Sequence, residues 1–73
     1  MGKKYNYVSF EIPDEGEKPI SYLGPSGIGR EFEKYDNPKV IKTTYGNGDE
    51  SIQIINGKTV EVFATFPLDL EQH

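Results

Sequence analysis

The residues of this chain that could carry out chemistry are few, and their spacing fits no catalytic or metal site. The sequence contains no cysteine, and its single histidine is the last residue, His73. Zinc sites usually rely on several Cys or His ligands, so we expect no zinc site. The loop 13–19 holds three carboxylates, but a calcium loop needs oxygen ligands at alternate positions and a distant Glu. We therefore expect no bound metal, no cofactor and no enzymatic activity.

The stretch 24–30, GPSGIGR, has the spacing of a phosphate-binding loop, because Gly24 and Gly29 are separated by four residues and a basic residue follows. Arg30 stands where such a loop has its Lys. Glu31 stands where it has the Ser or Thr that holds magnesium, and a carboxylate there repels phosphate. We interpret the stretch as a turn that joins two strands.

Five residues form the candidate binding site, and they are surface residues rather than catalytic ones. Tyrosine offers a broad apolar ring with a polar tip, so exposed tyrosines favour recognition surfaces. Near the N-terminus two tyrosines follow two lysines, and one phenylalanine lies on the polar side of a later predicted strand. The candidates are Tyr5, Tyr7, Lys3, Lys4 and Phe63. The alternative is that a loop or the segment 28–36 covers these rings as a second small core.

The composition favours a mainly β protein. The 73 residues include 5 Tyr, 4 Phe, 8 Gly and 5 Pro, and β-branched residues far outnumber Ala, Leu and Met. Branched and aromatic side chains suit a pleated sheet, while glycine and proline mark turns. The net charge of −4 argues against a surface that holds nucleic acid by neutralising phosphates. With no long apolar run and no secretory signal pattern at the N-terminus, we expect a soluble cytoplasmic protein.

The stretch 50–66 predicts a β-hairpin, because Asn56-Gly57 lies between two apolar, β-branched runs. A two-residue Asn56-Gly57 turn would leave both faces of the ribbon mixed. A three-residue loop that ends with Gly57 in a bulge gives one clean apolar face. We expect this bulged turn, with a core face that consists of Ile52, Ile54, Val60, Val62, Ala64 and Phe66.

Further strands are predicted along the chain. Residues 4–12 alternate, with Val8, Phe10 and Ile12 on one face, and 20–23 is a second short strand. Residues 39–45 place Ile41 and two further residues, Thr43 and Tyr45, on one face, and pairing Tyr45 with Glu50 sets Ile41 opposite Ile54. The segment 28–36 is either an edge strand or one short helix.

The sequence therefore predicts a single domain over residues 1–73, with an ordered core over about 4–66 and a frayed tail over 67–73. Its fold is a small antiparallel barrel or curled sheet of five to six short strands. We expect an accessory or inhibitory module that binds another protein, and its size and lack of chemistry suggest a phage or mobile-element origin. The alternatives are a single-stranded nucleic-acid binder that uses exposed tyrosines, and a structural subunit that forms homo-oligomers through sheet edges.

Overall fold

The computed structural model describes residues 2, 4–13, 19–25 and 27–72 of the chain. Within these residues the chain forms two antiparallel β-sheets and no helix. The first sheet has the strand order β1-β6-β5-β4, and the second has the order β3-β2-β7. The strands are β1 (Asn6–Glu11), β2 (Ile20–Leu23), β3 (Gly29–Glu31), β4 (Tyr35–Thr44), β5 (Glu50–Gly57), β6 (Thr59–Ala64) and β7 (Asp69–Gln72).

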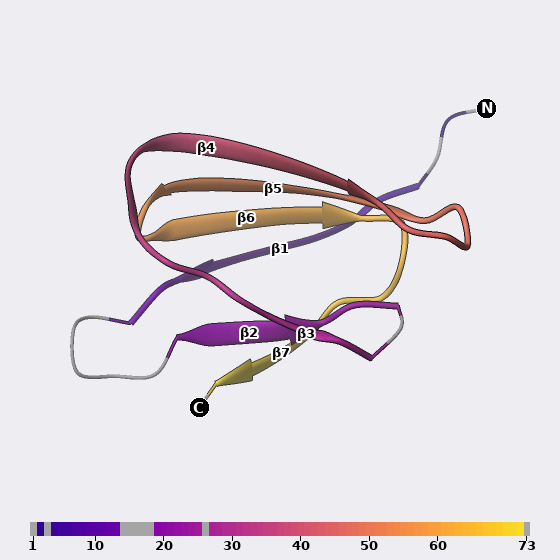
Figure 1. The fold of residues 1–73 in the computed structure, drawn as a ribbon, viewed down its shortest axis with the longest axis horizontal. Helices are drawn as coiled ribbons and strands as arrows, with labels where there is room; N and C mark the ends of the chain where they lie inside the picture. The colour runs from indigo at the N-terminus through magenta and orange to yellow at the C-terminus, as the bar shows by residue number, and fades with distance from the viewer. Residues whose placement is uncertain (1, 3, 14–18, 26, 73) are drawn as a thin grey trace.

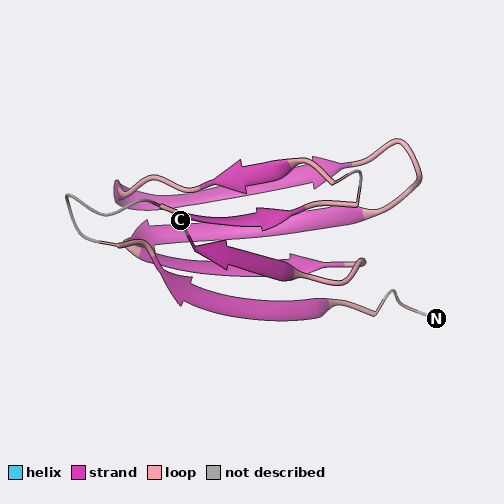
Figure 2. Cartoon of the chain, turned by 90° about the horizontal axis from the view of Figure 1, so that it is seen from below, coloured by secondary structure: helices cyan, strands magenta, loops and turns pink. Residues whose placement is uncertain are grey.

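The two sheets form an open sandwich whose strands run along the long direction of the molecule (Figures 1 and 2). The predicted mainly β, antiparallel fold is confirmed. The sheets do not close into a barrel, because β1 and β4 remain edges of the four-stranded sheet and β3 and β7 remain edges of the three-stranded sheet. The described residues form seven strands rather than the five to six that the sequence predicted.

The hairpin at Asn56-Gly57 is confirmed, but its predicted register is wrong. Asn56 pairs with Thr59, so the turn consists of Gly57 and Lys58. Gly57 has a φ of 64°, and no described residue other than glycine has a positive φ. A type I′ turn needs positive φ at both central residues, whereas a type II′ turn needs it only at the first. Gly57 therefore starts a type II′ turn, and neither the bulged loop nor the Asn56-Gly57 turn forms.

In the observed register, the face of β5 that packs on the core is the one opposite to the predicted face. Ser51, Gln53 and Ile55 lie opposite Ala64, Val62 and Val60, and all six side chains are buried. The predicted core face is right for β6 but wrong for Ile52 and Ile54, which are half-buried on the opposite face. The buried Ser51 and Gln53 are stable there because they are hydrogen-bonded to each other and to tyrosine hydroxyls.

In strand β4 the predicted core-facing residues are correct, but their predicted pairing with residues of β5 is wrong. Ile41, Thr43 and Tyr45 share the side that packs on the core and are half-buried, as predicted. Ile41 lies opposite Gln53 rather than Ile54, because Thr44, not Tyr45, pairs with Glu50. The Tyr45 N–H donates to the Asp49 carbonyl at 2.8 Å and closes the connecting loop.

The first strand is confirmed. β1 pairs with β6, so that Val8 lies opposite Val62 and Phe10 lies opposite Val60. Val8 and Phe10 pack against the core, and Ile12, just beyond the strand, is buried. The predicted alternation placed these side chains on the correct face.

The second sheet contains two elements that the sequence analysis left open or missed. Residues 29–31 form β3 and residue 35 begins β4, so the short-helix alternative for 28–36 is wrong. Residues 69–72 form β7, which pairs with β2, where we expected a frayed tail. The described residues contain no helix of the length and apolarity that a membrane span requires.

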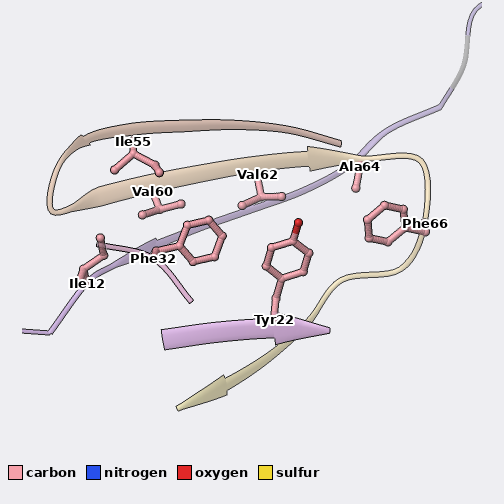
Figure 3. Close-up of a cluster of buried hydrophobic side chains, with 8 residues drawn as sticks. All are labelled: Ile12, Tyr22, Phe32, Ile55, Val60, Val62, Ala64 and Phe66. Atoms are coloured by element: carbon pink, nitrogen blue, oxygen red, sulfur yellow. The ribbon is translucent and has the colours of Figure 1, made fainter. Parts of the chain in front are cut away.

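The core lies between the two sheets (Figure 3). The Tyr22 ring reaches it from β2 and the Phe32 ring from just after β3, and the two rings stack with centroids 5.6 Å apart. Phe32 also contacts Phe10 of β1 edge-to-face, at 5.3 Å. The buried apolar residues are Ile12, Tyr22, Phe32, Ile55, Val60, Val62, Ala64 and Phe66. Packing on this side leaves the opposite face of the four-stranded sheet outside the core.

Candidate binding surface

The four-stranded sheet has one face on the core and one face that no described element covers. We call this second face the outer face, and we define it by the apolar and aromatic residues that project from it. They are Tyr5, Tyr7, Val40, Ile52, Ile54 and Phe63. The strand registers explain the grouping: Tyr7 lies opposite Phe63, and Phe63 lies opposite Ile52, so the three form a row across β1, β6 and β5.

Tyr7 and Phe63 form the centre of the outer face. Their ring centroids are 4.8 Å apart, with the planes inclined at 42°. Tyr7 remains 55% exposed and Phe63 is half-buried. The Tyr7 hydroxyl donates a hydrogen bond to Glu61 Oε1 at 2.9 Å. This hydrogen bond to a carboxylate raises the pKa of Tyr7 above its ordinary value, and it outweighs the contact with Ser9, which lowers the pKa.

Tyr5 directly precedes β1 and extends the outer face at the N-terminal end of that strand. It is 42% exposed, and its hydroxyl donates to Glu50 Oε1 at 3.3 Å. The next residue fixes the backbone here, because Asn6 Nδ2 donates to the Phe66 carbonyl at 2.8 Å. The ring of Tyr5 is thereby placed at one end of the same face as Tyr7.

Among the five predicted binding residues, the structure brings three together. Tyr5, Tyr7 and Phe63 share the outer face, Lys4 is exposed just before β1, and Lys3 lies outside the described residues. The segment 28–36 does not cover the tyrosine rings, since β3 belongs to the other sheet.

Sequence reasoning missed the aliphatic part of the outer face. Val40 is 65% exposed, and Ile52 and Ile54 are half-buried beside the aromatic pair. The predicted bulged turn placed both isoleucines in the core. The type II′ preference for Gly at the first central position was the signal that could have corrected the register.

Apart from the outer face, a group of hydrogen-bonded polar side chains lies inside the sandwich. Gln53 Nε2 donates to the Tyr22 hydroxyl at 2.5 Å and to Ser51 Oγ at 3.3 Å, and Ser51 Oγ lies 3.4 Å from the Tyr45 hydroxyl. Arg30 donates from Nη2 to Thr43 Oγ1 at 3.4 Å. These contacts link β2, β3, β4 and β5 through hydrogen bonds rather than through apolar packing alone.

The two inner tyrosines differ in acidity. Burial, followed by the hydrogen bond with Tyr45, raises the pKa of Tyr22. Burial also acts to raise the pKa of Tyr45, but the hydrogen bonds with Ser51 and Tyr22 and the charge of Arg30 together outweigh it and lower that pKa. Tyr45 is therefore the more acidic phenol of the pair.

Two backbone N–H groups in the described part of the turn 24–30 make hydrogen bonds within the turn. The Gly24 N–H donates to the Ile28 carbonyl at 3.0 Å, and the Gly27 N–H donates to the Gly24 carbonyl at 2.9 Å. Because these two N–H groups are used within the turn, they are not available to an anion. The turn joins β2 to β3, in agreement with the interpretation from sequence.

No group of metal-ligating side chains gathers among the residues that the structure describes. The carboxylates of 14–17 lie outside those residues. Comparison of the chain with protein-family models, curated proteins and solved structures gave no match.

Proposed function

We propose that this protein is a small, non-catalytic module that binds another protein through its outer face. The observation that carries the proposal is the row Tyr7–Phe63–Ile52, which crosses three strands on a sheet face that no described element covers. An apolar row of this kind is usually buried in a sandwich, and a partner surface would bury it here.

The composition of the outer face suits a protein partner. Its centre is aromatic and aliphatic, and its rim carries charged groups such as the Lys42–Glu50 ion pair, whose atoms are 3.8 Å apart. An apolar centre with tyrosine and a polar rim is the usual composition of protein interfaces. The tyrosine rings can contribute large contact areas at low cost in conformational entropy.

The charges on this face favour a protein over single-stranded nucleic acid. The hydroxyls of Tyr5 and Tyr7 each donate to a glutamate, so carboxylates lie beside both rings. A base stacked on either ring would bring its phosphate toward these carboxylates, and the net charge of −4 adds to the repulsion. We therefore expect a partner whose binding surface has an apolar centre and basic residues around it.

The test compares variants of the outer face in quantitative affinity capture. The double variant Tyr7→Thr/Val40→Thr removes the two most exposed apolar side chains of this face, and threonine keeps strand propensity. Ile28→Thr is the matched control, since Ile28 is 68% exposed in the turn between β2 and β3. All three proteins are immobilised, exposed to lysate of the source cell and compared by mass spectrometry.

The expected result is a protein that both the wild type and Ile28→Thr retain and that the double variant loses. Direct binding to that purified protein should weaken at least about tenfold in the double variant. Equal capture by all three proteins would contradict the assigned surface. Tight binding of oligo-dT that weakens steeply with salt, or a stable oligomer that the double variant dissociates, would replace a protein partner with nucleic acid or with a second copy of the chain.

A further inference from the structure

A pocket opens between the second sheet and the inner side of the four-stranded sheet, on the side where β3 and β4 are the edge strands. Its volume is about 160 Å³. Arg30 and Phe32 line it from the β3 side, and Ile41, Gln53 and Ile55 line it from β4 and β5. These residues lie on the inner side of the four-stranded sheet, so the pocket is separate from the outer face.

Arg30 places a positive charge at this pocket. It pairs with the fully buried Tyr22, and cross-strand partners share a sheet face, so its side chain points into the sandwich. Its guanidinium donates a hydrogen bond to the neutral hydroxyl of Thr43, and no carboxylate of the described residues lies within ion-pairing distance of it. A half-buried guanidinium with neutral partners gains a charge-assisted hydrogen bond when a carboxylate arrives.

Gln53 places an acceptor at the same pocket. The residue is 1% exposed, and its Nε2 already donates to Tyr22 and Ser51. The carbonyl Oε1 accepts no hydrogen bond from the described residues. A buried amide with one oxygen unused toward a pocket is suited to a ligand that donates a hydrogen bond.

The remaining walls define the size and the charge of the ligand. Phe32, Ile41 and Ile55 supply apolar surface, and a cavity of about 150 Å³ accepts a single aromatic ring. Glu31 and Glu33 also line the pocket, and both residues are exposed. Their negative charge repels a phosphate or sulfate ion more strongly than it repels a ligand with a single carboxylate.

We propose that this pocket binds a small monocarboxylate with an apolar, ring-sized body. Its carboxylate contacts the Arg30 guanidinium, and its body packs against Phe32, Ile41 and Ile55. A hydroxyl or amide N–H on the far side of the body donates to Gln53 Oε1. This proposal is independent of the proposed function, because the outer face contributes none of these residues.

The test is a titration of isotope-labelled protein with benzoate, followed by NMR amide shifts. We expect saturable shifts at millimolar benzoate for residues of β3, β4 and β5 around the pocket. 4-Hydroxybenzoate should bind more tightly than benzoate, because its hydroxyl can reach Gln53 Oε1. Benzyl alcohol, which lacks the charge, and inorganic phosphate should cause no saturable shift. A short peptide with a C-terminal phenylalanine is compared with the same peptide as its C-terminal amide. This comparison shows whether the pocket accepts the C-terminal carboxylate of a peptide as well as a free small acid.

Two variants assign the contacts. Arg30→Met should weaken benzoate binding about tenfold or more, while Lys42→Met, which removes an exposed cation from the opposite face of β4, should leave it unchanged. If Arg30→Met does not fold, Ile41→Phe retains the guanidinium and fills the pocket, and it should abolish binding. No saturable shift in the folded wild type, or equal affinity in the wild type and in Arg30→Met or Ile41→Phe, would overturn the proposal.

Discussion

The side-chain amide of Gln53 in β5 donates a hydrogen bond to the hydroxyl of Tyr22 in β2, and this bond joins the two sheets inside the core. Both side chains are buried, at 1% and 0% exposure. The bond explains how a glutamine can lie opposite Val62 in the core face of a small sandwich. It also makes the core depend on one specific donor and acceptor as well as on apolar contact.

Tyr22→Phe should therefore destabilise the fold by about 1–3 kcal/mol, because it leaves the buried Gln53 amide without its main acceptor. Chemical denaturation measures the change. Tyr7→Phe is the matched control, since Tyr7 is exposed and should lose no more than about 0.5 kcal/mol. Adding Gln53→Met to Tyr22→Phe should cost less than the sum of the two single variants. Strict additivity would show that the bond contributes nothing.

The turn at Gly57 gives a second prediction. Its φ of 64° is disfavoured for residues with a Cβ atom, so Gly57→Ala should cost about 1 kcal/mol of unfolding free energy. Gly46→Ala is the control, because Gly46 is in a loop without positive φ and has open space around it. That variant should be neutral or slightly stabilising. Equal losses in both variants would contradict the type II′ geometry.

The inner tyrosines predict a dependence on alkaline pH. The pKa of Tyr22 is raised by burial, so the folded protein holds this proton more tightly than the unfolded chain does. The resulting stability is complete below the ordinary tyrosine pKa and is lost as the pH rises through the raised value. Denaturation at a series of alkaline pH values should show this loss, and Tyr22→Phe should reduce it.

The lowered pKa of Tyr45 acts in the opposite direction. The folded state releases this proton more readily than the unfolded chain, so Tyr45 alone adds stability as the pH rises through its lowered folded-state pKa. Ultraviolet titration of phenolate should show Tyr45 ionising before Tyr22, and Tyr45→Phe should remove the early part of the curve. Loss of the early part in Tyr22→Phe but not in Tyr45→Phe would reverse the assignment.

The sequence predicted the faces of the strands that alternate cleanly. In β1, Val8 and Phe10 pack on the core because every second residue there is apolar, and β6 follows the same rule with Val60 and Val62. The exposure of Tyr7 on the other side of β1 follows from the same alternation. Part of the candidate surface could therefore be found from pattern alone.

Strand β5 could not be predicted in this way. Its apolar residues Ile52, Ile54 and Ile55 occupy both faces, so burial of apolar area does not select one register. The outcome depends on Gln53, whose hydrogen-bond partner Tyr22 lies 31 residues away. The pocket beside Arg30 could not be predicted from alternation either. It lies where β3 and β4, edge strands of two different sheets, come together.

If a partner protein covers the outer face, as we propose, binding should protect the backbone of the strands that form this face. The most direct measurement is backbone hydrogen exchange of this chain, alone and with the protein that affinity capture identifies. We expect slower exchange on binding in β1 and β4, the edge strands that carry Tyr7 and Val40, and in the adjoining parts of β5 and β6. Protection confined to β2, β3 and β7, with β1 and β4 unchanged, would contradict it.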